Sequence, residues 1–208
     1  MGLLKKLFAQ TRKPEGFLGK LMVGGMNQGG HVKLADWGLA QLKGIRPERI
    51  AELGCGGGRN ARELLRRYPG AKLTALDYSD VSVAKTEAFN RKEVDAGRCE
   101  VIRGSVSALP LENEGYDLAT AFETVYFWPG PEKCFAEVCR VLKPGGCFLI
   151  CNESDGTDAA GLRFEKIVEG MKCYTAGQLT EALTKAGFSR IKAVRHPSRP
   201  WLTVLAEK

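Results

Sequence analysis

Long apolar runs are missing from this chain of 208 residues. No stretch approaches the roughly 18 consecutive apolar residues that indicate a membrane-spanning helix, so we expect no membrane span. Near the start, Lys5 and Lys6 interrupt the apolar residues before the core of a signal peptide could form. A myristoylation motif would need Ser or Thr where Lys6 stands. The sequence therefore predicts a cytoplasmic protein.

Histidines and paired cysteines are also scarce. The two histidines, His31 and His196, are far apart in the sequence, and none of the seven cysteines belongs to a C-x-x-C pair. Zinc sites and disulfide frameworks depend on such spacings. Cys99, Cys147 and Cys151 fall in strand-like runs, where buried free thiols are common. We therefore expect no bound metal ion.

The overall composition is that of a single globular domain. Hydrophobic residues make up 44% and charged residues 26% of the chain, which excludes a disordered or fibrous protein. The net charge of +7 is concentrated at the two ends. The N-terminal group is Lys5, Lys6, Arg12, Lys13 and Lys20, and the C-terminal group is Arg190, Lys192, Arg195 and Arg199. Basic clusters are more often solvated surface than a nucleic-acid site, so a nucleic-acid partner is unlikely but remains open.

Strand-like and helix-like segments alternate along most of the chain. The strand-like runs are 49–53, 72–76, 99–103, 116–122 and 147–152, followed by 188–195 and 201–206. Helical periodicity occurs at 60–68, 79–96, 131–142, 158–170 and 175–186. Alternation of this kind predicts an α/β fold, a doubly wound, mainly parallel sheet of seven strands with helices on both faces. The proline-rich segment 196–200 favours a hairpin, so the last strand should be antiparallel.

The N-terminal residues 1–45 precede this pattern and are too short for a core of their own. They contain an amphipathic turn or two, a glycine-rich segment at 16–30 and a predicted helix at 33–42. We expect a helical extension that either covers the ligand edge of the sheet as a lid or packs against the domain formed by 46–208. A membrane-associated basic helix is a more remote alternative.

A glycine-rich turn follows the first strand. Residues 52–58 read ELGCGGG and lead directly into a helix-like segment. Glycines let the backbone approach a ligand closely, while free N–H groups and the positive end of the helix face it. A dinucleotide fingerprint would place its third glycine where Arg59 stands, which disfavours a nicotinamide oxidoreductase. The pattern here is E-x-G-x-G-x-G.

Three further features follow in order. Asp77 ends the second strand, where a carboxylate can accept hydrogen bonds from ribose hydroxyls. Residues 103–110 (RGSVSALP) follow the third strand, and residues 140–146 (RVLKPGG) form a proline and glycine turn before the fifth. Together with the glycine turn, this set resembles the class I S-adenosylmethionine (SAM) dependent methyltransferases, methyltransferase type 11. Within them it is similar to the small-molecule enzymes that methylate carbon in ubiquinone and menaquinone.

The resemblance implies a Rossmann-like fold with SAM at the carboxyl edge of the sheet. It assigns the methionine end of SAM to Glu52, Gly54, Cys55, Gly56 and Gly58, the ribose and adenine to Asp77, Tyr78, Ser105 and Val106, and the sulfonium to Phe122, Glu123 and Thr124. Ser105 stands where the family often has an acid, so the backbone N–H of Val106 is the alternative adenine contact.

The expected reaction is an in-line displacement of a methyl group onto a small-molecule acceptor. Positioning of the reactants should dominate the catalysis. Aromatic faces such as those of Tyr126 or Trp128 would stabilise a cationic sulfonium. If a base is needed, the titratable candidates near the expected opening are Glu123, Tyr126, His31, Glu153 and Tyr174. None of these is selected by the sequence.

Two alternatives remain open at this stage. One is an RNA-directed methyltransferase, although the chain lacks the Asn/Asp-Pro-Pro-Tyr/Phe motif of base N-methylation after the fourth strand. The other is a noncatalytic SAM- or RNA-binding module that uses the basic ends. The attacking atom is open, and the protein is expected to be a monomer or homodimer.

Overall fold

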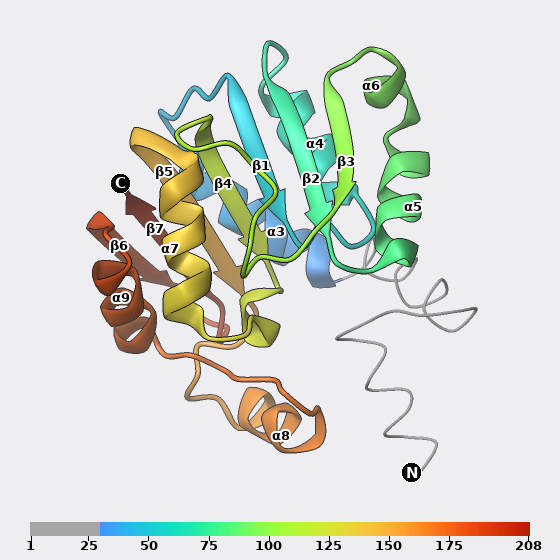
Figure 1. Cartoon of the computed structure of the whole chain (residues 1–208). Helices are drawn as coiled ribbons and strands as arrows, with labels where there is room; N and C mark the ends of the chain where they lie inside the picture. Colours follow the sequence, from blue (N-terminus) through green and yellow to red (C-terminus); the bar gives the residue numbers. More distant parts are fainter. Residues whose placement is uncertain (1–29) are drawn as a thin grey trace.

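A seven-stranded sheet forms the centre of the molecule, with strand order β3-β2-β1-β4-β5-β7-β6 (Figure 1). The computed structural model describes residues 30–208. Residues 1–29, which carry the predicted N-terminal turns and most of the predicted lid, lie outside the described residues. The strands are β1 (Arg49–Leu53), β2 (Lys72–Asp77), β3 (Cys99–Arg103), β4 (Tyr116–Phe122), β5 (Leu142–Asn152), β6 (Ser189–Arg195) and β7 (Leu202–Glu207).

The pairing of the strands confirms the predicted fold class. The pairs β1–β2, β1–β4, β2–β3 and β4–β5 are parallel. Strand β7 lies antiparallel to both of its neighbours, β5 and β6. The strand order reverses between β1 and β4, and in an open α/β sheet a ligand crevice is expected outside the carboxyl ends of the strands at such a switch point.

Helices cover both faces of the sheet. They are α3 (Gly30–Leu39), α4 (Arg59–Arg67), α5 (Asp80–Phe89), α6 (Arg91–Asp95), α7 (Pro131–Val141), α8 (Ala159–Ile167) and α9 (Ala176–Lys185), with 3-10 turns η1 (Ala40–Leu42) and η2 (Val125–Phe127). One buried cluster joins α3 and α4 to one face, and a second joins α7 and α9 to the other. Figure 1 shows α7 and α9 in front of the sheet and α3 and α4 behind it.

Most element ends lie within three residues of the sequence-based expectation, and two elements differ more. The single helix expected at 79–96 is divided into α5 and α6 at Asn90. The buried Asn90 side chain donates to the carbonyl oxygens of Gly58 and Thr86, so it ties the end of α5 to the glycine turn. Strand β5 begins at Leu142 instead of residue 147, because Leu142 pairs with Tyr116 across a register irregularity. The turn at 143–146 is therefore a bulge within the strand.

Helix α3 is held close to the sheet by a glycine. A Cβ atom on Gly38 would lie 2.6 Å from Cys151 Sγ and 3.2 Å from Phe122 Cε1. Real Cβ atoms essentially never approach so closely, so only glycine allows the helix this position. Trp37 packs beside Trp201 with ring centroids 6.0 Å apart. These contacts place α3 across the carboxyl end of the sheet.

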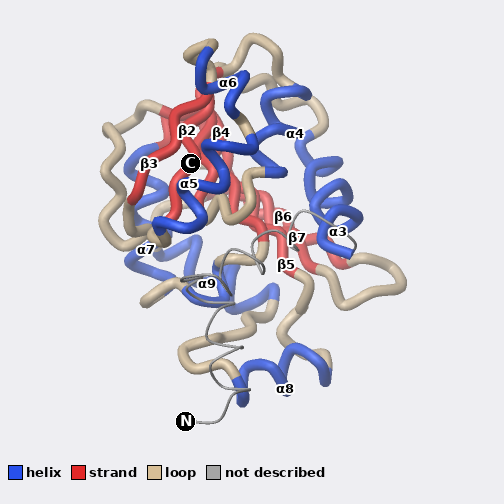
Figure 2. Tube along the Cα trace, turned by 90° about the vertical axis from the view of Figure 1, so that its right-hand side faces the viewer, coloured by secondary structure: helices blue, strands red, loops and turns tan. Residues whose placement is uncertain are grey.

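Helix α8 stands apart from the rest of the fold, beyond the carboxyl edge of the sheet (Figures 1 and 2). Leu162 and Phe164 on this helix are 39% and 45% exposed.

Within residues 30–208, no helix combines the length and apolar character that crossing a bilayer requires.

Candidate functional site

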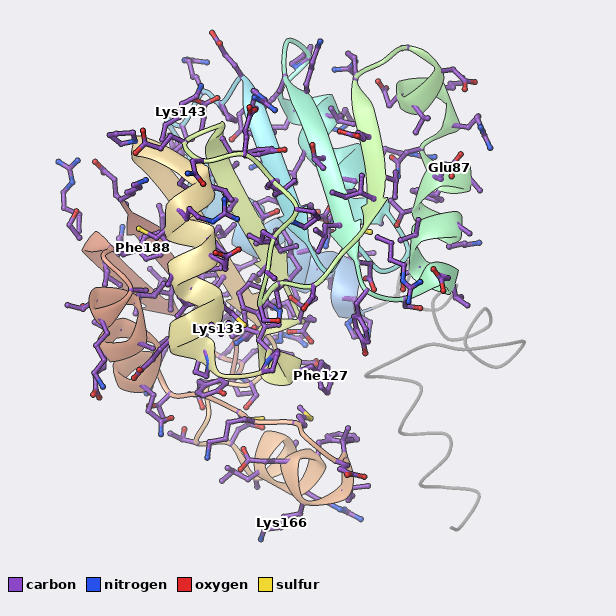
Figure 3. The ribbon with its side chains drawn as sticks, viewed as in Figure 1. Glu87, Phe127, Lys133, Lys143, Lys166 and Phe188 are labelled. Carbon is purple, nitrogen blue, oxygen red and sulfur yellow. The ribbon has the colours of Figure 1, made fainter. Side chains whose placement is uncertain are left out.

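A cavity of about 390 Å³ opens at the carboxyl ends of β1, β2 and β4. Its walls come from α3, the glycine turn, the start of α4, the loop after β3 and the segment after β4. Figure 3 shows Phe127, one of the lining residues, at the opposite end of the sheet from Lys143. The volume falls in the range of small-molecule pockets, about 300 to 1,000 Å³.

The glycine turn is fixed to the neighbouring strands by its backbone. The N–H groups of Gly54 and Cys55 both donate to the carbonyl oxygen of Leu76, at 2.7 and 3.0 Å. Gly54 has φ of +85°, and a Cβ there would lie 2.3 Å from Thr124 Cγ2. Because both the conformation and the close contact exclude other residues, the turn can form only with glycine at this position.

Asp77 connects this turn to the end of β2. The carboxylate is 7% exposed and accepts hydrogen bonds from the N–H groups of Gly56 (3.0 Å) and Ser79 (2.9 Å). Burial raises the pKa of Asp77, and these backbone hydrogen bonds oppose the increase. The backbone of Tyr78 and the side chain of Ser82 also interact favourably with this carboxylate, which lines the cavity.

Glu52 lies beneath the glycine turn and does not line the cavity. Its side chain is 1% exposed, and among the described residues its Oε2 atom has no hydrogen-bond partner. Burial, with the negative charge of Asp77 as a second cause, raises the pKa of Glu52 to about 8. A buried carboxyl group without a partner is unfavourable, so this position is suited to a cationic ligand group.

The other side of the cavity is built around Glu123, which follows β4. Its φ of +60° is in the left-handed region, a strained conformation for a residue other than glycine and one that clusters at functional sites. The Tyr126 hydroxyl donates to Glu123 Oε1 at 3.2 Å, and the Glu153 N–H also donates to this oxygen. Burial, together with the charge of Glu153, raises the pKa of Glu123 to about 8.

Tyr126 supports this carboxyl group from inside the core. It is 4% exposed and lies outside the cavity lining, and its hydroxyl also accepts a hydrogen bond from the Ser154 N–H at 2.9 Å. Burial raises the pKa of Tyr126 well above its ordinary value, so it stays a neutral donor. Trp128 reaches the cavity, but its ring stacks on Phe148 in the core with centroids 6.0 Å apart. One face of Trp128 is therefore occupied by the core.

The structure gathers most of the residues that the sequence singled out. Among the cofactor candidates, all line the cavity except Glu52 and Gly58, whose carbonyl oxygen accepts the Asn90 hydrogen bond. Of the catalytic candidates, His31 and Glu123 line the cavity, whereas Tyr126 and Tyr174 do not. Tyr174 packs against the core cluster of α7 and α9. The Glu153 side chain is exposed and its carboxylate lies near His31 and Glu123.

Several lining residues were not anticipated. They are Leu34 and Ala35 on α3, Arg59 and Asn60 at the start of α4, Ser82 on α5, and Pro129. Arg59 and Asn60 could have been found, because the first residues of a helix that follows a glycine turn face the same ligand. The contributions of α3 and α5 depend on how these helices dock, for which the local sequence has no signal.

Comparison with known proteins finds a matching family model. Residues 51–150 match the family model described as a methyltransferase domain. This stretch, just under half of the chain, is similar to a methyltransferase domain. A sterol 24-C-methyltransferase of Gibberella zeae is 32% identical over 111 residues, which are 53% of this chain and 29% of that protein. The chain spans half or less of the length of the sterol methyltransferases that it matches.

Solved methyltransferase structures share the fold. A SAM dependent methyltransferase from Aquifex aeolicus has a TM-score of 0.73 at 18% identity, covering 90% of this chain and 97% of that one. Human N-acetylserotonin methyltransferase in complex with SAM has a TM-score of 0.74 at 19% identity, covering 92% of this chain and 56% of that one. SAM is therefore the cofactor against which the cavity is compared.

The cavity fits this cofactor. Glu52 is buried beneath the glycine turn and its Oε2 atom has no partner among the described residues, so the ammonium of an amino acid end bound at the turn would lie on the side of this carboxyl group. Asp77, Leu76 and Val106 line the cavity, and a carboxylate and apolar side chains are the kinds of groups that would contact ribose hydroxyls and an adenine ring. The residues in and beneath the cavity therefore suit the ammonium, ribose and adenine groups of SAM.

Proposed function

We propose that this chain is an enzyme that transfers a methyl group from SAM to a small-molecule acceptor. One observation carries the proposal. The glycine turn, the Asp77 carboxylate and the strained Glu123 line a single cavity at the switch point of the sheet. One part of this cavity suits an adenosyl ligand, and the other part offers space and polar groups for a second molecule.

Some residues of the chain bind SAM, and others orient the acceptor. When bound, SAM supplies a methyl group on a sulfonium, which is a good leaving group. Gly54 and Asp77 fix the adenosyl side, and the aromatic Phe127 with Trp128 excludes water from the acceptor side. Holding two reacting atoms in line at about 3 to 3.5 Å contributes on the order of 7 to 11 kcal/mol. Glu123 orients the polar group of the acceptor.

The acceptor is a molecule with an apolar body and one polar group. The acceptor side of the cavity is walled by Leu34, Phe122, Phe127, Trp128 and Pro129, and the polar groups there are His31 and Glu123. We propose that residues 1–45 act as a lid over this side, since their described part includes α3, whose residues Leu34 and Ala35 line the cavity. We further propose a cytoplasmic protein that is a monomer or homodimer.

Calorimetric titration with SAM and with S-adenosylhomocysteine tests the donor site. Both should bind, and Gly56→Arg should abolish the binding because Gly56 lines the cavity at φ of +50°. The exposed Gly70, where an added Cβ would meet nothing within 4 Å, provides the matched control Gly70→Ala. Binding that is absent, or that is indifferent to Gly56→Arg, would reject the site.

A screen of metabolite extracts with a labelled methyl donor tests the reaction. A labelled small molecule supports the proposal and identifies the acceptor. Glu123→Gln should retain S-adenosylhomocysteine binding and lower turnover by about 100-fold, because it removes a group that orients the acceptor. Label in RNA, or salt-dependent RNA binding without turnover, would favour the RNA-directed alternatives. Those alternatives depend only on the basic ends and gain no support from the comparisons.

A further inference from the structure

Three potential metal ligands meet at the acceptor side of the cavity. His31 comes from the second residue of α3, Glu123 from the segment after β4 and Glu153 from the residue after β5. One ligand atom from each lies within 4.8 Å of the other two. His31 and Glu153 are exposed, so small rotations of their side chains can shorten these separations. Sequence spacing predicts no metal site because these residues are far apart in the chain and meet only in the fold.

The charges at this point are unbalanced. The Glu123 carboxyl lies beside Glu153, and within residues 30–208 no lysine or arginine pairs with either group. Two neighbouring carboxyl groups without a basic partner offer several oxygen ligands, and a bound divalent cation would neutralise their negative charge. Hydrogen bonds from the Tyr126 hydroxyl and the Glu153 N–H hold Glu123 Oε1 in place. The first ligand of a site is therefore already oriented by its surroundings, as the ligands of metal sites generally are.

We propose that His31, Glu123 and Glu153 form a divalent-cation site next to the methyl donor. One imidazole and two carboxylates are hard to intermediate ligands, suited to Mn²⁺ and related ions, and three protein ligands leave positions open for water or substrate. The seven cysteines are all free, but none belongs to the cluster. Soft thiolate coordination is thus not part of this site.

The site, which rests on the proposed function, selects an acceptor with a hydroxyl group. A divalent cation next to the donor would polarise the hydroxyl oxygen and lower its pKa. In the transfer, an oxygen lone pair forms the new C–O bond and the C–S bond breaks with its electron pair left on sulfur. The hydroxyl proton passes to water. No oxidant or further reactant is required.

Manganese binding to the full chain tests the site without any turnover. Bound Mn²⁺ loses the sharp electron paramagnetic resonance signal of the free ion, so a titration with MnCl2 counts sites and measures affinity. We expect one ion per chain, with affinity reduced at least about tenfold in His31→Ala and in Glu153→Gln. The matched controls are His196→Gln, which changes the other histidine, and Glu181→Gln, which changes an exposed glutamate on α9. Both controls should bind Mn²⁺ as the unmodified chain does.

The same preparations are titrated with S-adenosylhomocysteine, which shows that each variant is folded and separates the two proposals. Absence of stoichiometric Mn²⁺ binding, or equal binding by all variants, overturns the cation site even where S-adenosylhomocysteine binds normally. Mn²⁺ binding with the expected variant pattern but no S-adenosylhomocysteine binding supports the site and rejects the proposed function. In the labelled-methyl screen, a product methylated on oxygen supports the role of the cation, and a product methylated on carbon or nitrogen rejects it.

Discussion

The two sides of the cavity are built in different ways. On the donor side, backbone groups form most of the site. The turn at 54–58 is held by N–H groups that donate to Leu76 and Asp77, and its glycines set its shape. On the acceptor side, side chains from α3, the segment after β4 and the end of β5 converge on Glu123. The backbone there is strained instead of regular.

This difference predicts how the two sides of the cavity respond to substitution. A backbone site tolerates few changes, because replacing a glycine or the carboxylate that holds the turn alters the shape of the whole turn. A side-chain site can be altered one residue at a time while the scaffold stays intact. We therefore expect changes on the donor side to affect both folding and S-adenosylhomocysteine binding, and changes on the acceptor side to affect turnover or cation binding while S-adenosylhomocysteine binding is retained.

Among the variants considered, Gly54→Ala should disrupt the structure of the donor side most severely. The new Cβ would have to occupy a left-handed conformation and would lie 2.3 Å from Thr124 Cγ2. Strain and overpacking together should destabilise the fold by about 3 to 5 kcal/mol and weaken S-adenosylhomocysteine binding by at least about 100-fold. Urea denaturation and calorimetry measure the two effects. Gly44→Ala is the control, since Gly44 has φ of +92° but nothing within 4 Å of an added Cβ. An equal loss of binding in the control would contradict the role of the close contact.

Glu52→Gln should remove a pH dependence of the stability that comes from the buried Glu52 carboxyl on the donor side. Because the pKa of Glu52 is raised to about 8 in the fold, its stabilising contribution is complete below about pH 4 and is lost as the pH rises to about 8. The amide of glutamine does not titrate. The stability of the unmodified chain relative to Glu52→Gln should therefore fall by about 2 to 4 kcal/mol between about pH 5 and pH 8.

Urea denaturation across that pH interval measures the Glu52 effect. Glu100→Gln, at an exposed position on β3, is the control and should show no such change. A pH-independent difference between Glu52→Gln and the unmodified chain would show that Glu52 ionises normally in the fold.

Asp77→Ala should weaken the donor side through lost hydrogen bonds. The N–H groups of Gly56 and Ser79 lose their carboxylate acceptor, and a ribose loses its partner. We expect a cost of about 2 kcal/mol, or roughly 30-fold in the calorimetric affinity for S-adenosylhomocysteine. Asp117→Ala is matched to it, because Asp117 also accepts two backbone N–H groups, from Glu48 and Arg49, but next to Lys143 at the other end of the sheet (Figure 3). It should lose stability and keep the affinity; a similar loss of affinity there would contradict a local role for Asp77.

Tyr126→Phe, on the acceptor side, should have the smallest effect of the four variants. Without its hydroxyl, Glu123 loses one of its two donors and the Ser154 N–H loses its acceptor. Turnover should fall about five- to tenfold, corresponding to about 1 kcal/mol, while S-adenosylhomocysteine affinity stays unchanged. Tyr116→Phe, which removes a buried hydroxyl bonded to Thr74, should leave turnover unchanged. Equal changes in turnover for both variants would mean that the effect is one of general stability.

The fold and the donor side could be predicted from the sequence to a large extent. Strand periodicity located β1, β3 and β4 with their observed bounds, Pro131 began α7 as expected, and Gly187 follows α9 with φ of +99°. These features are local, because a strand, a cap or a glycine turn is specified by residues adjacent in the chain. The division of the helix at Asn90 was missed because its cause is a hydrogen bond to Gly58, which is distant in sequence.

The sequence by itself determined the order of strands and helices, the glycine turn and the acid at the end of β2, since each follows from short-range periodicity and backbone conformation. Tertiary structure alone decided which side chains reach the acceptor. It withdrew Tyr126 and Tyr174 from the cavity, brought α3 against the sheet through Gly38, and joined His31 to Glu123 and Glu153. The reason is physical. Groups from distant segments meet only through the way the helices pack on the sheet, and no local pattern in the chain encodes the distance between such groups.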